Sequence, residues 1–467
     1  MQNPSATRTT RKSRTTSIAD TGRATSTTRK NGTTRTTRTT RILAATGLAL
    51  ASGLVLAACS GGSGGGGASD DLTATGPITI WYSNNATEVE WGKQMVEAWN
   101  AENPDQEITA QEIPAGKSSE EVIGAAITAG NAPCLVLNTA PSAVGQFEKQ
   151  GGLVNLSEFP DGAEYIETRS GDLAEQYQNA DGDYFQFPWK SNPVVIFYNK
   201  DLFAQAGLDP ENPKLSTYDD FLATSKALVD AGVAPYAIQP APTSEFFQMQ
   251  FDFYPLYAAA TGGAQIVEDG KATFADEAGY EAAGFWRDLY DQGLAGQEQY
   301  QGDSFADSQA AMAIVGPWAI SVYGDMNFGS VPVPTPEATP ADEVWTFSDA
   351  KNIGLFSACE NKGTAWEVLK FVTSEEQDGQ FLELTGQMPL RQDLPTVYAD
   401  YFAANPEYVA FGDQASRTVE VPAGPNTVQI MQTFRDAWSK AVIFGEGDVD
   451  AALDEAAATI DGLASQP

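Results

Sequence analysis

Short apolar runs alternate along this chain with longer segments in which apolar residues recur every three to four positions. The first kind is typical of buried or half-buried strands, and the second of amphipathic helices. The pattern predicts strands at 78–82, 108–113 and 134–138 and helices at 88–100 and 119–129. Strands separated by helices at this spacing predict an α/β lobe built on a parallel sheet.

Several tryptophans stand at helical spacing among other apolar residues. In the first predicted helix, Trp91, Met95 and Trp99 recur at intervals of four and share one face. We therefore expect the helical tryptophans to be core residues: Trp91, Trp99, Trp286, Trp366 and Trp438. Near the end of the chain, residues 448–463 predict an amphipathic helix with Asp448 as its N-cap and Leu453, Ala457 and Ile460 facing inward.

The N-terminal part has a different pattern. A basic, Thr-rich stretch at 1–41 precedes an apolar run at 42–58, which ends in Leu-Ala-Ala before Cys59 and a Gly/Ser-rich segment. This resembles a bacterial lipoprotein signal. The resemblance implies a signal peptide at 1–58, a lipidated (palmitate-bearing) Cys59, and a flexible tether at 59–74 on the outer face of the cell membrane. The alternative is an uncleaved membrane helix, for which the apolar run is short.

Charge and composition exclude several classes of function. Without residues 1–41, 17 basic and 61 acidic residues remain, a formal net charge of −44, which disfavours nucleic acids and anionic surfaces. The chain has no histidine, which excludes Ser-His-Asp and Cys-His catalysis and histidine metal sites. Asp181 and Asp183 flank Gly182, and we interpret them as a turn rather than a calcium site. No cofactor and no metal are expected.

Two cysteines remain after Cys59, and each lies at the end of an apolar run. Export permits a disulfide between Cys134 and Cys359, the one intramolecular pairing available to them. Two buried free thiols are the alternative.

The order of several segments resembles a known family. Val-Val-Ile-Phe-Tyr-Asn-Lys-Asp-Leu-Phe at 194–203 precedes Ala-Gly-Leu at 206–208, then Ala-Met-Ala-Ile-Val-Gly-Pro-Trp at 311–318, and finally Gly-Gln-Met-Pro-Leu-Arg at 386–391. This succession resembles the extracellular solute-binding proteins of ABC importers, and within them the carbohydrate-binding group that includes maltose-binding protein. The resemblance extends over about 75–465.

The resemblance implies a two-lobed α/β fold of the periplasmic-binding-protein kind (type II), in which each lobe is a mostly parallel sheet flanked by helices. The first lobe would take 75–190 and 320–372, and the second 191–319 and 373–467. The strand that returns from the second lobe would lie beside the third strand, so Cys359 would face Cys134. The family often has Gly-Lys before Ala-Met and Pro-Asp before the third strand, whereas this chain has Ser-Gln at 308–309 and Pro-Cys at 133–134.

The implied function is capture of a sugar or short oligosaccharide in a cleft between the lobes and its delivery to a permease, without catalysis and as a monomer. Hinge closure around the ligand would signal occupancy. A sugar site needs aromatic faces for the C–H side of the ring and polar groups for the hydroxyls. The expected ligand residues are Trp318, Trp189, Asn192, Trp81, Ser83, Asn84, Thr139, Ser142, Asp252, Tyr254, Tyr257 and Arg391.

Three alternatives stay open at this point. The same fold would also hold a non-sugar solute such as an amino compound. A surface glycoside hydrolase needs only a pair of carboxyl groups, and a chain this acidic contains many possible pairs. A structural or adhesive surface lipoprotein would need no ligand cleft.

Overall fold

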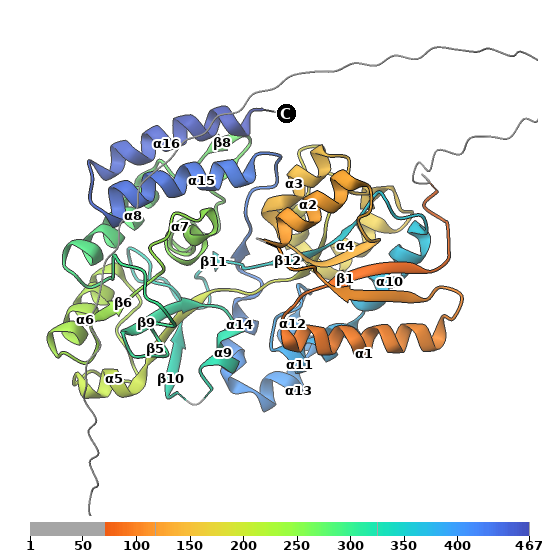
Figure 1. Cartoon of the computed structure of the whole chain (residues 1–467). Coiled ribbons are helices and arrows are strands. Elements are labelled where there is room, and N and C mark those ends of the chain that lie inside the picture. Colours follow the sequence, from red (N-terminus) through yellow and green to blue (C-terminus); the bar gives the residue numbers. More distant parts are fainter. Residues whose placement is uncertain (1–70, 117, 325, 467) are drawn as a thin grey trace, which may run out of the picture. The chain divides into compact units, whose positions relative to one another are not determined.

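The computed structural model describes residues 71–116, 118–324 and 326–466. Two mixed β-sheets form its centre, each flanked by helices (Figure 1). This confirms the α/β class. The expected signal peptide at 1–58, Cys59 and the tether as far as residue 70 lie outside the described residues. In the described ranges, no helix has both the length and the apolar character needed to cross a bilayer.

The first sheet has the order β2-β1-β3-β12-β4, and its parallel strands β2, β1 and β3 lie on one side. β12 returns antiparallel between β3 and β4. The strands are β1 (Ile78–Tyr82), β2 (Ile108–Glu112), β3 (Leu135–Thr139), β4 (Phe187–Lys190) and β12 (Lys351–Leu355). The accompanying helices are α1 (Ala86–Glu102), α2 (Ser119–Ala129), α3 (Pro141–Lys149), η1 (Leu156–Glu158), α4 (Gly162–Ser170), η2 (Gly171–Tyr177), α10 (Lys362–Val372) and α11 (Glu375–Thr385).

Local signals explain where these elements begin and end. The Asn85 side chain accepts hydrogen bonds from the backbone N–H groups of Thr87 and Glu88 and so caps α1. Ser118 caps α2 in the same way, and Gly130, at φ 68°, ends it in the left-handed conformation that glycine adopts without strain. The strands and helices predicted between 78 and 139 are confirmed to within two residues at each boundary.

The second sheet has the order β10-β5-β9-β6, and only its β6–β9 pair is parallel. Its strands are β5 (Val195–Asn199), β6 (Tyr236–Ile238), β9 (Ala310–Val315) and β10 (Phe328–Val331). The longer helices around it are α5 (Lys200–Gln205), α6 (Tyr218–Asp230), α7 (Phe253–Thr261), α8 (Glu277–Asp291), α15 (Thr427–Trp438) and α16 (Val449–Ala464). Asp448 caps α16, with Leu453, Ala457 and Ile460 buried, as predicted.

Short elements complete the fold. β11 (Thr346–Phe347) pairs with β13 (Thr418–Val419), and β7 (Val267–Glu268) pairs with β8 (Lys271–Ala272). The short helices are η3 (Phe246–Phe251), α9 (Ala319–Val322), α12 (Leu394–Val397), α13 (Ala399–Ala404), η4 (Pro406–Tyr408), α14 (Val409–Gln414) and η5 (Ser439–Ile443). The core surrounding the first sheet and the core surrounding the second form separate apolar clusters. The five helical tryptophans are all buried in one or the other, as predicted.

Two features of the implied lobes are wrong. Mostly parallel sheets were expected, but each sheet contains two antiparallel pairings. The segment 320–347 was assigned to the first lobe, yet it adds β10 to the free edge of β5, and Val333, Val344 and Phe347 lie in the core of the second sheet. Conversely, Phe381 of α11 packs on Trp91 and Trp189 of the first lobe. The Gly-Pro-Trp motif marks the end of β9, but the chain leaves the second lobe only after β11.

Three chain segments cross between the sheets and are hydrogen-bonded to one another. The backbone N–H of Ser191 donates to the carbonyl of Met388 (2.9 Å). The backbone N–H of Asp349 donates to the carbonyl of Asn192 (3.0 Å). The hydroxyls of Ser191 and Ser348 lie 2.8 Å apart. The first crossing segment follows β4, the second precedes β12, and the third follows α11.

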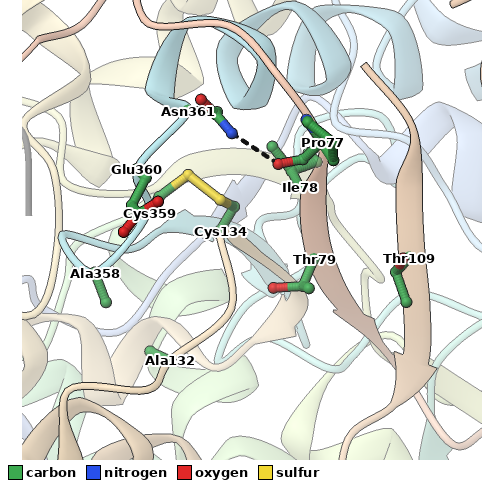
Figure 2. Close-up of a pocket in the computed structure, with 10 residues that line it drawn as sticks. All are labelled: Pro77, Ile78, Thr79, Thr109, Ala132, Cys134, Ala358, Cys359, Glu360 and Asn361. Carbon is green, nitrogen blue, oxygen red and sulfur yellow. Dashed lines mark hydrogen bonds between the residues drawn. A yellow bond between two sulfur atoms is a disulfide. The ribbon is translucent and has the colours of Figure 1, made fainter. Parts of the chain in front are cut away.

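A disulfide joins Cys134 and Cys359 across 225 residues of sequence (Figure 2). Its position follows from the sheet, because Leu355 at the end of β12 pairs with Leu135, and the backbone N–H of Phe356 donates to the carbonyl of Cys134. This is the pairing that the family resemblance implied. The bond fixes the loop after β12 to the start of the central strand.

Removing this bond is expected to destabilise the fold. Changing Cys134 and Cys359 together to serine should lower the free energy of unfolding by roughly 2–5 kcal/mol, since the unfolded chain regains the freedom of a long loop. Urea denaturation of the form that begins at Ser60 measures this loss. A thiol assay under denaturing, non-reducing conditions should detect no free thiol in the unmodified form, and two titratable thiols would contradict the pairing.

Candidate functional site

A hollow of about 330 Å³ lies at one edge of the second sheet. The parallel strands β6 and β9 both end at this edge, and ligands of open α/β sheets bind at the carboxyl ends of such strands. Residues that follow β6, residues of η3, a segment that precedes β9 and the last residues of β9 surround it. The lining residues are Ile238, Gln239, Pro240, Ala241, Gln248, Phe251, Gly302, Asp303, Ser304, Phe305, Ala313, Ile314, Val315 and Tyr323.

The lining includes two glutamines and three aromatic residues, and none of its residues is Lys or Arg. The Gln239 side chain donates to the carbonyl of Glu298 (3.1 Å), while its own oxygen is buried and has no hydrogen-bond partner in the described part of the chain. Asp303 is the one lining residue with a carboxyl group. It accepts the Tyr323 hydroxyl (2.7 Å) and the backbone N–H of Phe305 (3.0 Å). Burial, reinforced by that contact with Asp303, raises the pKa of Tyr323.

Trp318 stands beside this hollow and is half-buried. Its ring meets the ring of Phe251, a lining residue, edge to face at 6.2 Å between centroids. A Cβ at Gly316 would lie 1.8 Å from the indole, so only glycine at 316 lets the indole fold back in this way. Trp318 was predicted, whereas Phe251 was missed. Phe251 lies one position before Asp252, the first of the predicted ligand residues in this part of the chain.

A second group of predicted residues gathers at the carboxyl edge of the first sheet. β1 and β3 are adjacent and parallel, so the residues that follow them share this edge. Trp81 is half-buried and Asn84 is exposed, and both retain surface for a ligand. Ser83 is buried and accepts the N–H of Asn85, while buried Thr139 donates to the carbonyl of Val136. Ser142 is buried in the first turn of α3.

Asn138 belongs to the same edge and was not predicted. Its φ of 83° is left-handed, and it lies where the register between β3 and β12 shifts by one residue. Such a β-bulge redirects the side chain of the extra residue. Asparagine tolerates this conformation better than most residues. The available sequence signal was an Asn at the end of the strand predicted at 134–138.

Two residues predicted before the first crossing are engaged in the interior. Trp189 is 1% exposed, and its ring packs between Trp91 (5.6 Å) and Phe381 (4.8 Å), so it has no face left for a ligand. Asn192 is 2% exposed, donates to Gln387 (3.1 Å) and accepts the backbone N–H of Met388 (3.3 Å). Both predictions of ligand contact are corrected: these side chains hold the crossing together.

The predicted second-lobe contacts are buried as well. Asp252 forms a buried ion pair with Arg435 at 2.6 Å. The Tyr254 hydroxyl donates to the carbonyl of Glu420 (2.6 Å), and the ring of Tyr257 stacks on Phe253. Each of the three predicted residues is at most 1% exposed, which corrects their assignment as ligand contacts. They belong to α7 or cap it, and the hollow takes its residues from the preceding η3.

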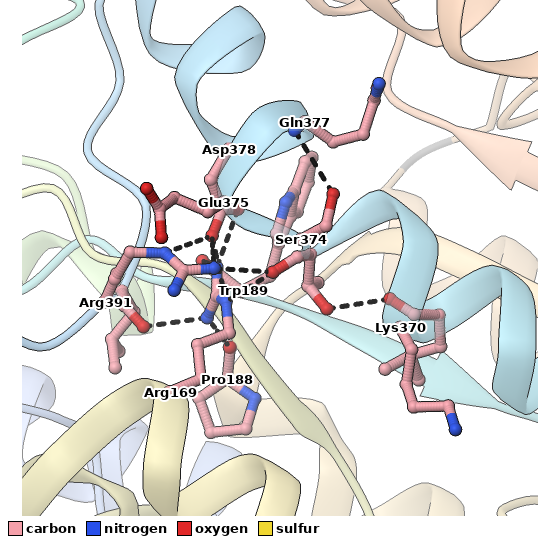
Figure 3. A network of polar contacts seen from close by, with 12 residues as sticks. Arg169, Pro188, Trp189, Lys370, Ser374, Glu375, Gln377, Asp378 and Arg391 are labelled. Carbon is pink, nitrogen blue, oxygen red and sulfur yellow. Dashed lines mark hydrogen bonds and ion pairs between the residues drawn. The ribbon is translucent and has the colours of Figure 1, made fainter. Parts of the chain in front are cut away.

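Arg391 is part of a buried ionic network and not of the hollow (Figure 3). Its guanidinium donates to Asp378 (3.0 Å) and to the carbonyl of Thr373 (2.9 Å). Arg169 of α4 binds the same carboxylate through two nitrogens, at 3.0 and 2.9 Å. Its remaining N–H groups donate to the carbonyls of Pro188, Trp189 and Leu390. The predicted ligand role of Arg391 is therefore corrected to a structural one.

Further buried polar groups lie near the crossings. Glu88 in the first turn of α1 pairs with Lys190 (2.6 Å) and accepts the amide of Gln387 (2.7 Å). Glu420, next to β13, is 3% exposed, and burial raises its pKa to about 8. The Tyr177 hydroxyl donates to it at 3.5 Å. These groups bind one another, and none of them lines the hollow.

Three comparisons place the chain among known proteins. A family model described as bacterial extracellular solute-binding protein matches residues 84–379. A binding protein of Brucella abortus is 24% identical over 294 residues, 61% of this chain and 68% of that protein. The maltodextrin-binding protein MdxE of Bacillus subtilis is 25% identical over 277 residues, 56% of this chain and 61% of its own length.

The fold also matches solved structures. The cyclic alpha-maltosyl-1,6-maltose binding protein of Arthrobacter globiformis superposes with a TM-score of 0.73 at 22% identity. The match covers 84% of this chain and 99% of that one. At this identity the likeness establishes a shared two-lobed fold.

Removal of the buried carboxylate of Asp378 should be costly. Asp378→Asn leaves buried Arg169 without a counter-charge and also removes the partner of half-buried Arg391, and breaking a buried pair costs about 3–5 kcal/mol. Urea denaturation measures the loss. Asp230→Asn is the matched control, because its ion pair with Lys226 is exposed, and it should cost less than about 1 kcal/mol. Equal small losses in the two variants would contradict the structural role of the network.

Glu420 should make stability depend on pH. Its folded pKa of about 8 lies above the ordinary 4.5, so between these values the folded protein holds a proton that the unfolded chain has lost. The free energy of unfolding contributed by Glu420 therefore falls as pH rises through this window, by at most about 1.4 kcal/mol per pH unit. Glu420→Gln should flatten the profile between pH 5 and about 8. Glu455→Gln, at an exposed position on α16, should leave it unchanged; parallel profiles for all three proteins would refute the assignment.

Proposed function

This chain belongs to the bacterial extracellular solute-binding proteins, and from that premise we propose that it captures a neutral sugar or short oligosaccharide for an ABC importer. The observation that carries the proposal is the hollow at the carboxyl edge of the second sheet, with Trp318 and Phe251 meeting at its side. The cargo is delivered to the membrane permease. The protein itself catalyses no reaction.

The chemistry of the hollow suits a sugar better than a charged solute. Aromatic rings cover the apolar C–H face of a sugar, and the amide of half-buried Gln248, a lining residue, offers a donor and an acceptor to its hydroxyls. A phosphorylated or carboxylated cargo calls for Arg or Lys, and the residues that line the hollow include neither. The names of the maltodextrin-binding and cyclic-maltosyl-maltose-binding relatives point in the same direction.

The edge of the first sheet completes the site in this proposal. Trp81, Asn84 and Asn138 retain surface there, and Ser83, Thr139 and Ser142 shape the loops that carry them. Closure about the three crossing segments brings this edge to the ligand and presents a new surface to the permease. The protein acts as a monomer held at the outer face of the cell membrane by lipid on Cys59, through the tether at 59–74.

Hydrolysis of a glycoside is not favoured by the site. Glycosidases use a pair of carboxyl groups on either side of the bond that breaks. Among the residues that line the hollow, Asp303 alone has a carboxyl group, and that group is engaged by Tyr323 and the backbone of Phe305. We therefore retain binding without turnover.

Thermal unfolding against a panel of sugars tests the proposal. The panel holds mono-, di- and trisaccharides of glucose, xylose and galactose, with amino acids, polyamines and glycerol phosphate as controls. A neutral sugar at about 100 times its dissociation constant should stabilise the protein by roughly 2.7 kcal/mol. Stabilisation by glycerol phosphate or an amino compound alone would overturn the sugar assignment, and no response to any solute would overturn capture of this class.

Trp318→Ala tests the site itself. It should weaken binding of the sugar that stabilises the unmodified protein by more than about 1 kcal/mol, since truncation removes an aromatic face. Titration calorimetry measures the affinity, and thermal unfolding without ligand verifies folding. An unchanged affinity in a folded variant would remove Trp318 from the site.

A further inference from the structure

The segment that joins β6 to η3 forms part of the hollow but has no regular structure of its own. Residues 239–245 belong to no helix or strand, and the first three of them line the hollow. Proline has no backbone N–H, so Pro240 and Pro242 remove two possible hydrogen bonds from this segment. In the described part of the chain, residues 240–244 make no backbone–backbone hydrogen bond. Side chains from elsewhere therefore have to hold this wall of the hollow in place.

Two side chains of α15 supply these contacts. The Gln432 amide donates to the carbonyl of Ser244 (2.8 Å). The Arg435 guanidinium donates to the carbonyls of Thr243 (2.8 Å) and Ala241 (3.4 Å). The two donors stand three positions apart on one helix, a spacing that places them on the same face.

The helix and its two donors are themselves fixed. Phe434 of α15 is fully buried in the apolar core around the second sheet. The Arg435 guanidinium is held by the carboxylate of Asp252 at 2.6 Å. The Gln432 amide also donates to the carboxylate of Asp436, one turn later on the same helix (2.8 Å). Both donors are therefore oriented independently of any ligand.

Gln432 is the donor that can be changed without unfolding the protein. Arg435 is fully buried, and its loss would leave the carboxylate of Asp252 buried without a counter-charge. Gln432 is neutral and half-buried. Its acceptor belongs to exposed Ser244, so water can replace the lost donor at that carbonyl.

We propose that Gln432 is a positioning residue for the hollow, whose amide holds the segment 239–244 in the conformation that receives the ligand. Gln432 is not among the residues that line the hollow, so it acts through the segment and not on the ligand. A wall that is ordered beforehand does not have to be ordered on binding, which raises affinity. This inference rests on the proposed function and identifies a residue that preorganises its site.

The motion of the ligand-free segment gives the first test. Gln432→Met removes both N–H donors and keeps the length of the side chain. Backbone order parameters from NMR relaxation should fall at Ala241, Thr243 and Ser244 from about 0.85 to below about 0.6, because one anchor of an otherwise unbonded segment is gone. Thermal unfolding without ligand should differ little from that of the unmodified protein.

Affinity gives the second test. Titration calorimetry with the sugar that stabilises the unmodified protein should show a loss of about three- to tenfold in Gln432→Met, the effect of one hydrogen bond. Gln432→Arg keeps N–H donors at this position and should restore both the affinity and the order parameters. Gln429→Met is the matched control, because Gln429 is exposed on the same helix and its side chain has no hydrogen bond to 239–244 in the described ranges.

Each other outcome has a definite meaning. Weaker binding without added motion at 241–244 would overturn the inference, because Gln432 would then act on the ligand directly. Added motion with unchanged affinity would overturn it as well, and so would Gln432→Arg or Gln429→Met behaving like Gln432→Met. Failure of the unmodified protein to bind any sugar would instead defeat the proposed function, and the order parameters would still decide whether Gln432 holds the segment.

Discussion

One buried guanidinium joins the segments that lead out of the first lobe. Arg169 donates to the Asp378 carboxylate and to the carbonyls of Thr373, Pro188, Trp189 and Leu390, at distances of 2.7 to 3.2 Å. These partners belong to β4, to the end of α10, to α11 and to the segment that crosses after α11. A planar group with five donors suits such a task, because each N–H finds an acceptor and Asp378 supplies the charge. The two outward crossings are thereby fixed to each other at the point where they leave the first lobe.

The crossings are joined by polar contacts, while the two lobes are filled by apolar ones. Each sheet has its own cluster of buried side chains, and the segments between them meet through Ser191, Ser348, Asn192 and Gln387. Met388 of the third crossing also packs in an apolar cluster with Val195 and Phe197 of β5. The same polarity explains why Asn192, a predicted ligand contact, is a structural residue here. Buried backbone groups outside a sheet still need hydrogen-bond partners, and the Asn192 side chain provides one for the N–H of Met388.

The sequence predicted elements well because the signals that set them are local. Asn85 and Asp448 cap helices through their own neighbours, and the spacing of Trp91 and Trp99 defines a buried face whatever the rest of the chain does. The direction in which a side chain points at the site is set by partners that are distant in sequence. Trp189 and Lys190 are neighbours on one strand, yet their partners come from α1 and α11, far away in sequence.

Several ligand contacts implied by the resemblance were wrong because the contacts of these side chains come from distant parts of the chain. Asp252 is held by Arg435, which lies 183 positions later, and no pattern near 252 indicates that partner. Gln239 and Phe251 were not predicted as site residues. They line the hollow only because two segments that are separate in sequence come together at one edge of the sheet. The Gly-Pro-Trp motif did place Trp318 beside the hollow, because the glycine that lets the indole fold back is only two residues away. Predictions survived where the determining contact was close in sequence.

Electrostatics link the surface of the protein to the cargo proposed for it. The chain beyond residue 41 carries a formal net charge of −44, which repels anionic solutes at a distance within the screening length of the medium. A binding protein for phosphorylated cargo would have to overcome this field with cations at its site. The lining of the hollow contains none, and its carboxylate, on Asp303, adds to the same sign. A neutral sugar carries no net charge and is not repelled by this field. The acidic surface therefore does not slow capture of the sugar. Charge at the surface and charge at the hollow therefore favour the same class of ligand.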